Sequence, residues 1–284
     1  MCIPSHALSW QLQWPRNEVM TPLPSPCPHV QAFTEGSTGW LVLNRPDRRN
    51  ALNAAMWAAI PAVMDVLAGI PDVRVIVLRG AGSEAFAAGA DISEFDDARN
   101  DAAAAARYER LNGAAFAAIR GCTKPLIAMI QGFCIGGGLA IALAADIRIA
   151  DRSARFALPP ARLGLAYPLD GLRDLVATVG AAAAKEMIFT ARRLTGEDAL
   201  AFGLINRLAD DIVVETQALC EDIAEGAPLT ITHAKRAIDM IAGRPGAIDT
   251  DHVRELAARC FDSADYAEGR AAFAEKRKPR FSGR

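Results

Sequence analysis

Two segments rich in glycine and alanine constrain what this chain can fold into. The sequence AFAAGADI spans Ala85–Ile92 and QGFCIGGGLA spans Gln131–Ala140, and each follows a short apolar run typical of a buried strand. Because parallel strands end at the same edge of their sheet, we expect both segments to turn from strand to helix there. Glycine lets a ligand approach the backbone, and a helix start leaves N–H groups unpaired. The pair predicts an oxyanion hole, in which two amides bind one oxygen; packing is the alternative for each turn alone.

The pattern around these turns predicts an α/β fold. Short apolar strands alternate with alanine-rich helical stretches, as βαβ units require. The strands are expected at Trp40–Leu43, Val73–Leu78, Pro125–Ile130 and Ile147–Ala150, and the helices at Ala54–Leu67, Asp101–Ile119 and Gly138–Ala144. Beyond Gly171 the pattern changes to successive helices.

Composition excludes several classes of protein. With 284 residues, 51% hydrophobic content and a net charge of −2, the chain has ample material for a core and no basic surface for nucleic acid. No apolar run approaches the roughly 18 residues of a membrane span. The six cysteines form no CxxC pair and the four histidines lie far apart, which predicts no metal site and a reducing compartment. We therefore expect a cytoplasmic protein that contacts neither membrane nor nucleic acid.

The first thirty residues differ from the rest. They are rich in proline and lack any hydrophobic period, so residues 1–30 are expected to form a disordered extension. They also lack the unbroken apolar stretch of a secretory signal. Either Met1 or Met20 could be the natural start.

Further motifs extend the argument over most of the chain. LVLNRPDRRNALN spans Leu41–Asn53, AADIRIADRSARFALP spans Ala144–Pro159, KEMIFTARRLTGEDALAFGLINRL spans Lys185–Leu208, and EGRAAFAEKRKPRF spans Glu268–Phe281. With the two turns, they closely resemble the crotonase superfamily, also called the enoyl-CoA hydratase/isomerase family, from about Gly39 to the C-terminus. This resemblance implies a spiral ββα core over residues 31–210 and a helical C-terminal trimerisation region over residues 211–284. It also implies homotrimers, often stacked as hexamers.

The resemblance assigns roles to residues of the site. The N–H groups of Ala90 and Gly137 would bind the thioester carbonyl of an acyl-CoA, with coenzyme A entering as part of the substrate and no permanently bound cofactor. Residues that would contact the coenzyme are Arg49, Ala51 and Leu52 along the pantetheine and phosphates, Ala88, Asp91 and Ile92 around the adenine, and Phe273 and Lys276 closing over it, often from an adjacent subunit. Arg49 could equally be a solvated surface residue. Asp91 could cap a helix, and Asp146 resembles a structural carboxylate.

The sequence departs from the hydratases of this family at their two catalytic glutamates. Ala140 and Pro160 occupy those positions, and neither can transfer a proton. Some relatives carry an aspartate eight residues further on, where this chain has Pro168. Asp170 is the nearest replacement as an acid or base, and capping a helix that begins near Gly171 is its alternative role.

Other ionisable groups are weaker candidates for proton transfer. Arg162 and Tyr167 lie close to Asp170 in sequence, and Glu94 lies beyond the first turn. For these three the alternatives are an ion pair, packing and a solvated surface.

Two functions remain open. The first is an enzyme of fatty acid metabolism, a lyase or isomerase of enoyl-CoA hydratase/isomerase type that stabilises a thioester enolate. The second is a carrier or regulator that binds acyl-CoA and has lost hydratase activity. The sequence leaves the acyl chain unidentified, because the pocket walls would come from segments around Phe95–Tyr108 and Phe116. It also does not distinguish hydration, isomerisation and decarboxylation.

Overall fold

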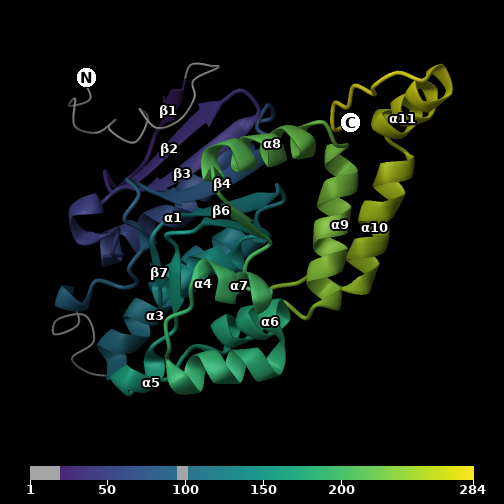
Figure 1. Ribbon diagram of the computed structural model, residues 1–284. Coiled ribbons are helices and arrows are strands. Elements are labelled where there is room, and N and C mark those ends of the chain that lie inside the picture. Colours follow the sequence, from purple (N-terminus) through teal and green to yellow (C-terminus); the bar gives the residue numbers. More distant parts are fainter. Residues whose placement is uncertain (1–19, 95–101) are drawn as a thin grey trace.

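A seven-stranded sheet lies at the centre of the chain (Figure 1), in a computed structural model that describes residues 20–94 and 102–284. The strand order is β1-β2-β3-β4-β6-β8-β10. Strands β1 to β3 pair antiparallel, and those from β3 to β10 pair parallel. The strands are β1 (Thr21–Leu23), β2 (Val30–Glu35), β3 (Thr38–Leu43), β4 (Val75–Gly80), β6 (Leu126–Ile130), β8 (Ile147–Asp151) and β10 (Arg207–Ala209). The α/β class predicted from the sequence is confirmed.

A second, smaller sheet carries the two glycine-rich turns. Its parallel strands are β5 (Ala85–Ala87), β7 (Phe133–Ile135) and β9 (Arg155–Ala157), in that order. The prediction that both turns leave the same edge of a parallel sheet is confirmed, because β5 and β7 are neighbours. The strands that lead into the turns are these short ones, however, and not the longer β4 and β6. A three-residue strand is too short to show a hydrophobic period.

Helices cover both faces of the large sheet. The helices of the described chain are α1 (Ala54–Gly69), α3 (Ala102–Gly121), α4 (Gly137–Ala144), α5 (Pro160–Leu163), α6 (Leu169–Thr190), α7 (Gly196–Ala201), α8 (Ile212–Ala224), α9 (Pro228–Ile241), α10 (Thr250–Phe261) and α11 (Ala264–Glu275), of which the last three do not cover the sheet. The alternating side chains of β3 explain why both faces need cover: Leu41 packs in the cluster with α1, and Trp40 packs in the cluster with α8. Helix α8 therefore belongs to the core by its packing.

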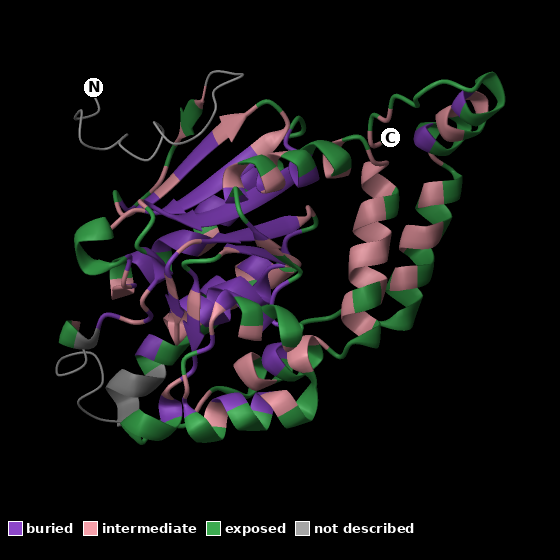
Figure 2. Ribbon diagram, in the orientation of Figure 1, coloured by how far each residue is buried: buried purple, intermediate pink, exposed green. Residues whose placement is uncertain are grey.

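The last three helices stand away from the sheet (Figure 1). We call residues 228–284, which include α9, α10 and α11, the C-terminal arm. Neither α9 nor α10 has a buried residue, and Figure 2 shows both in the colours of intermediate and exposed residues. Several large apolar side chains of the arm are exposed: Ile238, Ile241, Phe261, Tyr266 and Phe273. None of the described helices is long and apolar enough to traverse a lipid bilayer.

The prediction of a disordered extension over residues 1–30 is wrong for its last part. Strand β1 pairs with β2, with Thr21 opposite Thr34 and Pro22 opposite Phe33. Proline is tolerated there because β1 is an edge strand, whose outer side needs no donor. Cys27 and Val30 are buried in the core. Residues 1–19 lie outside the described part of the chain, as does Phe95.

Candidate active site

The first glycine-rich turn points the amide of Ala90 away from Leu52, the residue that it pairs with. Leu52 donates its N–H to the carbonyl of Gly89 at 2.8 Å and accepts from the N–H of Asp91 at 2.9 Å. Because Leu52 makes both bonds of this parallel bridge, the N–H of the intervening Ala90 faces the opposite side. Among the described residues, no acceptor pairs with that N–H.

The second turn presents another amide. Gly136 donates its N–H to the carbonyl of Ala157 at 2.9 Å, which ties the turn to β9, and adopts a φ of 52° that favours glycine. Gly137 then begins helix α4, whose first hydrogen bond runs from Ala140 N–H to Gly136 O at 3.0 Å. The N–H of Gly137 lies in the first turn, so it has no partner within the helix. The helix dipole makes this end favourable for negative charge.

The two amides lie close enough to share one oxygen. A Cβ placed on Gly137 would stand 3.5 Å from the nitrogen of Ala90. A Cβ lies about 2.5 Å from its own nitrogen, so the two nitrogens are at most about 6 Å apart. Two donors that each reach one oxygen at about 2.7–3.1 Å satisfy the same limit. The geometry is therefore compatible with an oxyanion hole.

Aromatic side chains from α1 and α3 form a wall beside Gly137. The Cζ2 atom of Trp57 lies 3.1 Å from the position of a Cβ on Gly137. The indole donates to the hydroxyl of Tyr108 at 3.0 Å and packs edge-to-face on Phe116 with a centroid separation of 5.4 Å. Tyr108 also donates to Leu52 O at 3.4 Å. The sequence pointed to Tyr108 and Phe116 but missed Trp57, which lies on the buried face of α1.

The segment that would contact coenzyme A pairs with the first turn. Ala88 donates its N–H to the carbonyl of Arg49 at 3.0 Å, and Leu52 bridges Ala90. Asp91 accepts from Ser93 Oγ at 2.7 Å and pairs with Arg45 at 2.6 Å. The structure thus brings together the following candidates: Arg49, Ala51, Leu52, Ala88, Ala90, Asp91 and Ile92.

Asp91 itself has a structural role. It precedes the single turn η3 (Ile92–Glu94), and its Oδ1 accepts from the N–H of Ser93 at 3.0 Å. The Ser93 hydrogen bonds, together with the Arg45 guanidinium, lower the pKa of Asp91 below its usual range. Its carboxylate therefore orders the turn, in agreement with the capping alternative.

The side chain of Arg49 points away from this site. Its Cζ lies 5.2 Å from the ring centroid of Phe133, and its Nε is 3.9 Å from Glu84. Phe133 begins β7, whereas the oxyanion turn follows the end of that strand. The solvated position, which the sequence left open, fits this orientation, since 60% of the side chain is exposed.

Two of the residues expected to contact coenzyme A lie on the C-terminal arm, away from the two glycine-rich turns. Phe273 is in α11 with 89% of its surface exposed, and Lys276 ends that helix in a left-handed conformation. Within one chain, α11 stands on the opposite side of the molecule from α1 and α3 (Figure 1). A single chain does not bring them to the amides of Ala90 and Gly137.

The two positions that the resemblance aligns with the hydratase glutamates hold no carboxylate. Ala140 is buried in α4, and Pro160 begins α5. Glu94 is engaged elsewhere, because its Oε2 accepts from the N–H of Ala54 at 2.9 Å. Burial raises the pKa of Tyr167, whose hydroxyl has no partner among the described residues.

Asp170 lies at the surface, in the first turn of α6. Its side chain is 56% exposed and lies 3.7 Å from Arg120 and 3.9 Å from Arg173. The helix begins at Leu169 with Pro168 as its N-cap, so the expectation that Asp170 caps a helix near Gly171 is wrong. The proline supplies the extended conformation that a helix start requires.

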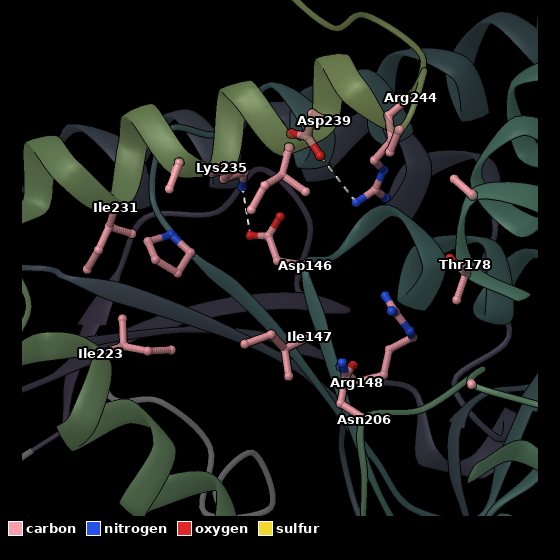
Figure 3. Close-up of a pocket in the computed structure, with 16 residues that line it drawn as sticks. Asp146, Ile147, Arg148, Thr178, Asn206, Ile223, Ile231, Lys235, Asp239 and Arg244 are labelled. Carbon is pink, nitrogen blue, oxygen red and sulfur yellow. Dashed lines mark hydrogen bonds and ion pairs between the residues drawn. The ribbon is translucent and has the colours of Figure 1, made fainter. Parts of the chain in front are cut away.

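Asp146 has structural contacts, as the sequence suggested. Its Oδ2 accepts from the N–H of Leu126 at 2.7 Å and from Lys235 Nζ at 2.8 Å. It lines a cavity of about 540 Å³ between the core and α9, which does not include either turn (Figure 3). Over residues 20–94 and 102–284, no cluster of histidine, cysteine and acidic side chains could hold a metal ion.

Comparisons with known proteins agree with this architecture. The family model described as enoyl-CoA hydratase/isomerase matches residues 34–284. Short-chain-enoyl-CoA hydratase of Clostridium acetobutylicum is 34% identical over 248 residues, which cover 86% of this chain and 94% of that protein. Human enoyl-CoA hydratase domain-containing protein 2, mitochondrial, is 34% identical over 259 residues, 86% of this chain and 85% of its own.

Solved structures share the fold. The crystal structure of an enoyl-CoA hydratase/carnithine racemase from Magnetospirillum magneticum has a TM-score of 0.86 and 36% identity, covering 92% of this chain and 97% of that one. DspI of Pseudomonas aeruginosa has a TM-score of 0.82 and 33% identity, covering 89% and 96%. By sequence and by fold, the chain belongs to the enoyl-CoA hydratase/isomerase family, the crotonase superfamily.

Proposed function

We propose that this protein is an enzyme that binds an acyl-CoA thioester and stabilises its enolate between the N–H groups of Ala90 and Gly137. The observation that carries the proposal is the convergence of two unpaired amides from separate turns within about 6 Å. An enolate concentrates negative charge on the thioester oxygen, where both donors and the α4 dipole would act. Each donor in such a site supplies about 2.7–4 kcal/mol of barrier lowering.

The protein surface around the amides suits a coenzyme A thioester. The backbone of Ala51, Leu52, Ala88 and Ile92 lies beside the first turn and would contact the pantetheine and adenine. Phe273 and Lys276 would close over the coenzyme from another subunit of a trimer or hexamer. The exposed apolar side chains of the C-terminal arm support such an assembly, because large apolar patches usually mark interfaces.

The reaction would not use the two-glutamate route of hydratases. With Ala140 and Pro160 at those positions, the acid–base contribution of roughly 10²–10⁴ per group must come from elsewhere. Asp170 is the acid or base that we propose first. Its exposure means that it would act on a substrate only after the acyl chain or a neighbouring segment reaches it.

The second candidate function is acyl-CoA binding without turnover. Two observations favour it. Ala140 and Pro160, which cannot transfer protons, occupy the positions that the resemblance gives to the glutamates, and the carboxylate of Glu94 is bonded to the N–H of Ala54 at the start of α1. Such a protein would keep the thioester cradle as a carrier or regulator.

Incubation with enoyl-CoA esters separates the two functions. We expect the purified protein to consume crotonyl-CoA or a longer enoyl-CoA, followed as loss of the conjugated thioester absorbance. Asp170→Asn should abolish turnover, whereas the matched change Asp251→Asn on exposed α10 should leave it unchanged. Binding of acyl-CoA by calorimetry with no turnover would establish the carrier. Absence of both binding and turnover would contradict both proposed functions.

A further inference from the structure

Two guanidinium groups from other elements bind the C-terminal end of α4, opposite its proposed oxyanion amide. Arg148 of β8 donates from Nη1 to the carbonyls of Ala145 at 3.0 Å and Ala142 at 3.4 Å. Its Nε donates to Leu204 O at 2.8 Å, and the residue is buried. The carbonyls of Ala142 and Ala145 lie at the C-terminal end of α4. Carbonyls at that end of a helix have no partners within the helix. A cation there stabilises the helix through its dipole.

The C-terminal arm supplies the second guanidinium. Arg244, just beyond α9, donates from Nη2 to Leu143 O and from Nη1 to Ala145 O. Its charge is balanced by Asp174 of α6 at 3.3 Å and by Asp239 of α9 at 3.6 Å. Figure 3 shows the ion pair between Arg244 and Asp239 above the buried Arg148. Only 14% of the Arg244 side chain is exposed.

The other contacts of the arm reach different elements. Lys235 bonds to Asp146 and to the carbonyl of Lys124, and Arg236 bonds to the carbonyl of Arg120. These attach α9 to the end of α3, to the segment before β6 and, through Asp146, to the residue that follows the C-cap of α4. Among the described residues of the arm, Arg244 alone hydrogen-bonds to α4.

The opposite end of α4 is packed against β5 without spare room. A Cβ on Gly138 would stand 2.3 Å from the carbonyl oxygen of Ala87. Along its length the helix carries only glycine, alanine, leucine and isoleucine, so no side chain of its own can hydrogen-bond to fix its position. The polar contacts that resist a shift of α4 along its axis are therefore those at its two ends.

We propose that Arg244 is a positioning residue that links docking of the C-terminal arm to the placement of the Gly137 amide. This inference rests on the proposed function, because it gives α4 the role of presenting that amide to the thioester oxygen. Loss of the Arg244 bonds removes the hydrogen bonds of the arm from the last turn of α4. That turn then keeps only the bonds to Arg148, and the short helix can shift. A displacement near 1 Å at a catalytic donor can lower a rate by about 10²-fold.

A spectroscopic probe of the thioester carbonyl tests the proposal. Cinnamoyl-CoA bound in an oxyanion hole should show a red-shifted absorbance, because the donors polarise its conjugated carbonyl. In Arg244→Gln we expect the shift at saturating ligand to fall by about half or more, with kcat about 10-fold lower and KM changed less than about 2-fold. The matched control Asp239→Asn removes a carboxylate partner of Arg244 but leaves its bonds to α4, and should keep the full shift.

Each outcome decides a different claim. Absence of a red shift in the wild-type protein would contradict the proposed function itself. A wild-type red shift that persists unchanged in folded Arg244→Gln would overturn the positioning role and leave the proposed function intact. Thermal unfolding of each variant shows whether it is folded. If Arg244→Gln does not fold, Arg244→Lys decides, since lysine keeps the charge but cannot span both carbonyls; an undiminished shift there would also overturn the proposal.

Discussion

The indole of Trp57 lies against the first residue of helix α4, where a Cβ on Gly137 would stand 3.1 Å from Cζ2 and 3.3 Å from Cη2. The ring cannot easily retreat, because Tyr108 accepts its N–H and Phe116 packs on its face. The same Cβ would lie 3.5 Å from the nitrogen of Ala90, the other proposed donor. This relationship makes glycine at 137 a requirement of the site.

Gly137→Ala should therefore impair the site more than the fold. Alanine keeps the backbone N–H, but its methyl group would hinder the approach of the thioester oxygen to the donors. We expect kcat on an enoyl-CoA substrate to fall by about 10²–10³, as when one oxyanion donor is lost. The free energy of unfolding should decrease by about 1–3 kcal/mol, as for overpacking by one methyl group. Steady-state turnover and urea unfolding measure the two quantities.

A second substitution tests whether contact with the indole causes the loss of stability in Gly137→Ala. Trp57→Phe removes the ring atoms that the new methyl group meets, so the double variant should regain part of the lost stability. The stability changes should thus be non-additive. Strict additivity would mean that the indole does not restrict residue 137.

Gly138→Ala provides a test of how closely α4 packs on β5. The added Cβ would stand 2.3 Å from Ala87 O and 2.7 Å from Ala87 Cβ, distances that require backbone movement. We expect a loss of about 3 kcal/mol in the free energy of unfolding. The control is Gly113→Ala in α3, which has open space around it and should gain up to about 1 kcal/mol from helix propensity. Equal effects in urea unfolding would contradict the close packing.

The sequence predicted the parts of the fold that repeat along the chain. Hydrophobic period and glycine placement located helices near those observed at α1, α3 and α4, and identified the two turns. Strands β5 and β7 were missed because three residues carry no hydrophobic period. These short strands set the turns side by side, so the geometry of the site depends on elements that pattern alone does not reveal.

Residues that support the site were harder to predict because their partners are distant in sequence. Trp57 and Tyr108 are 51 residues apart, and Asn50 bonds to carbonyls 31 and 35 residues away. Nothing local distinguishes such an asparagine or tryptophan from a surface or core residue. Asp170 shows the converse: its place in the chain suggested an acyl pocket, yet its side chain is exposed in the first turn of α6.

Asn50→Ala should destabilise the fold strongly. The buried side-chain amide donates to the carbonyls of Ala81 and Ala85 and accepts from the N–H of Arg45 at 2.9 Å. Its φ of 54° is also unfavourable for alanine. We expect a loss of about 2–4 kcal/mol, since three buried groups lose their partner.

The matched control for Asn50 is Asn53→Ala. Asn53 is the N-cap of α1, and its side chain accepts one hydrogen bond, from the N–H of Met56 at 2.9 Å, so its removal should cost about 1 kcal/mol. Urea unfolding compares the two variants. Equal losses would show that the Asn50 bonds add nothing beyond an ordinary cap.

Asp91 should make stability fall in acid. Its pKa is lowered in the folded state, first by the Ser93 hydrogen bond and then by Arg45, so its contribution is complete above the unfolded pKa of about 4. As the pH falls below about 4 and through the folded pKa, protonation removes that contribution. The stability difference between wild type and Asp91→Asn should be constant from about pH 5 to 8 and shrink below about pH 4. Ser93→Ala and Arg45→Gln should each reduce this acid dependence, because each removes a side chain that lowers the pKa of Asp91. Urea unfolding at a series of pH values measures it, and parallel curves for wild type and Asp91→Asn below pH 4 would contradict a depressed pKa.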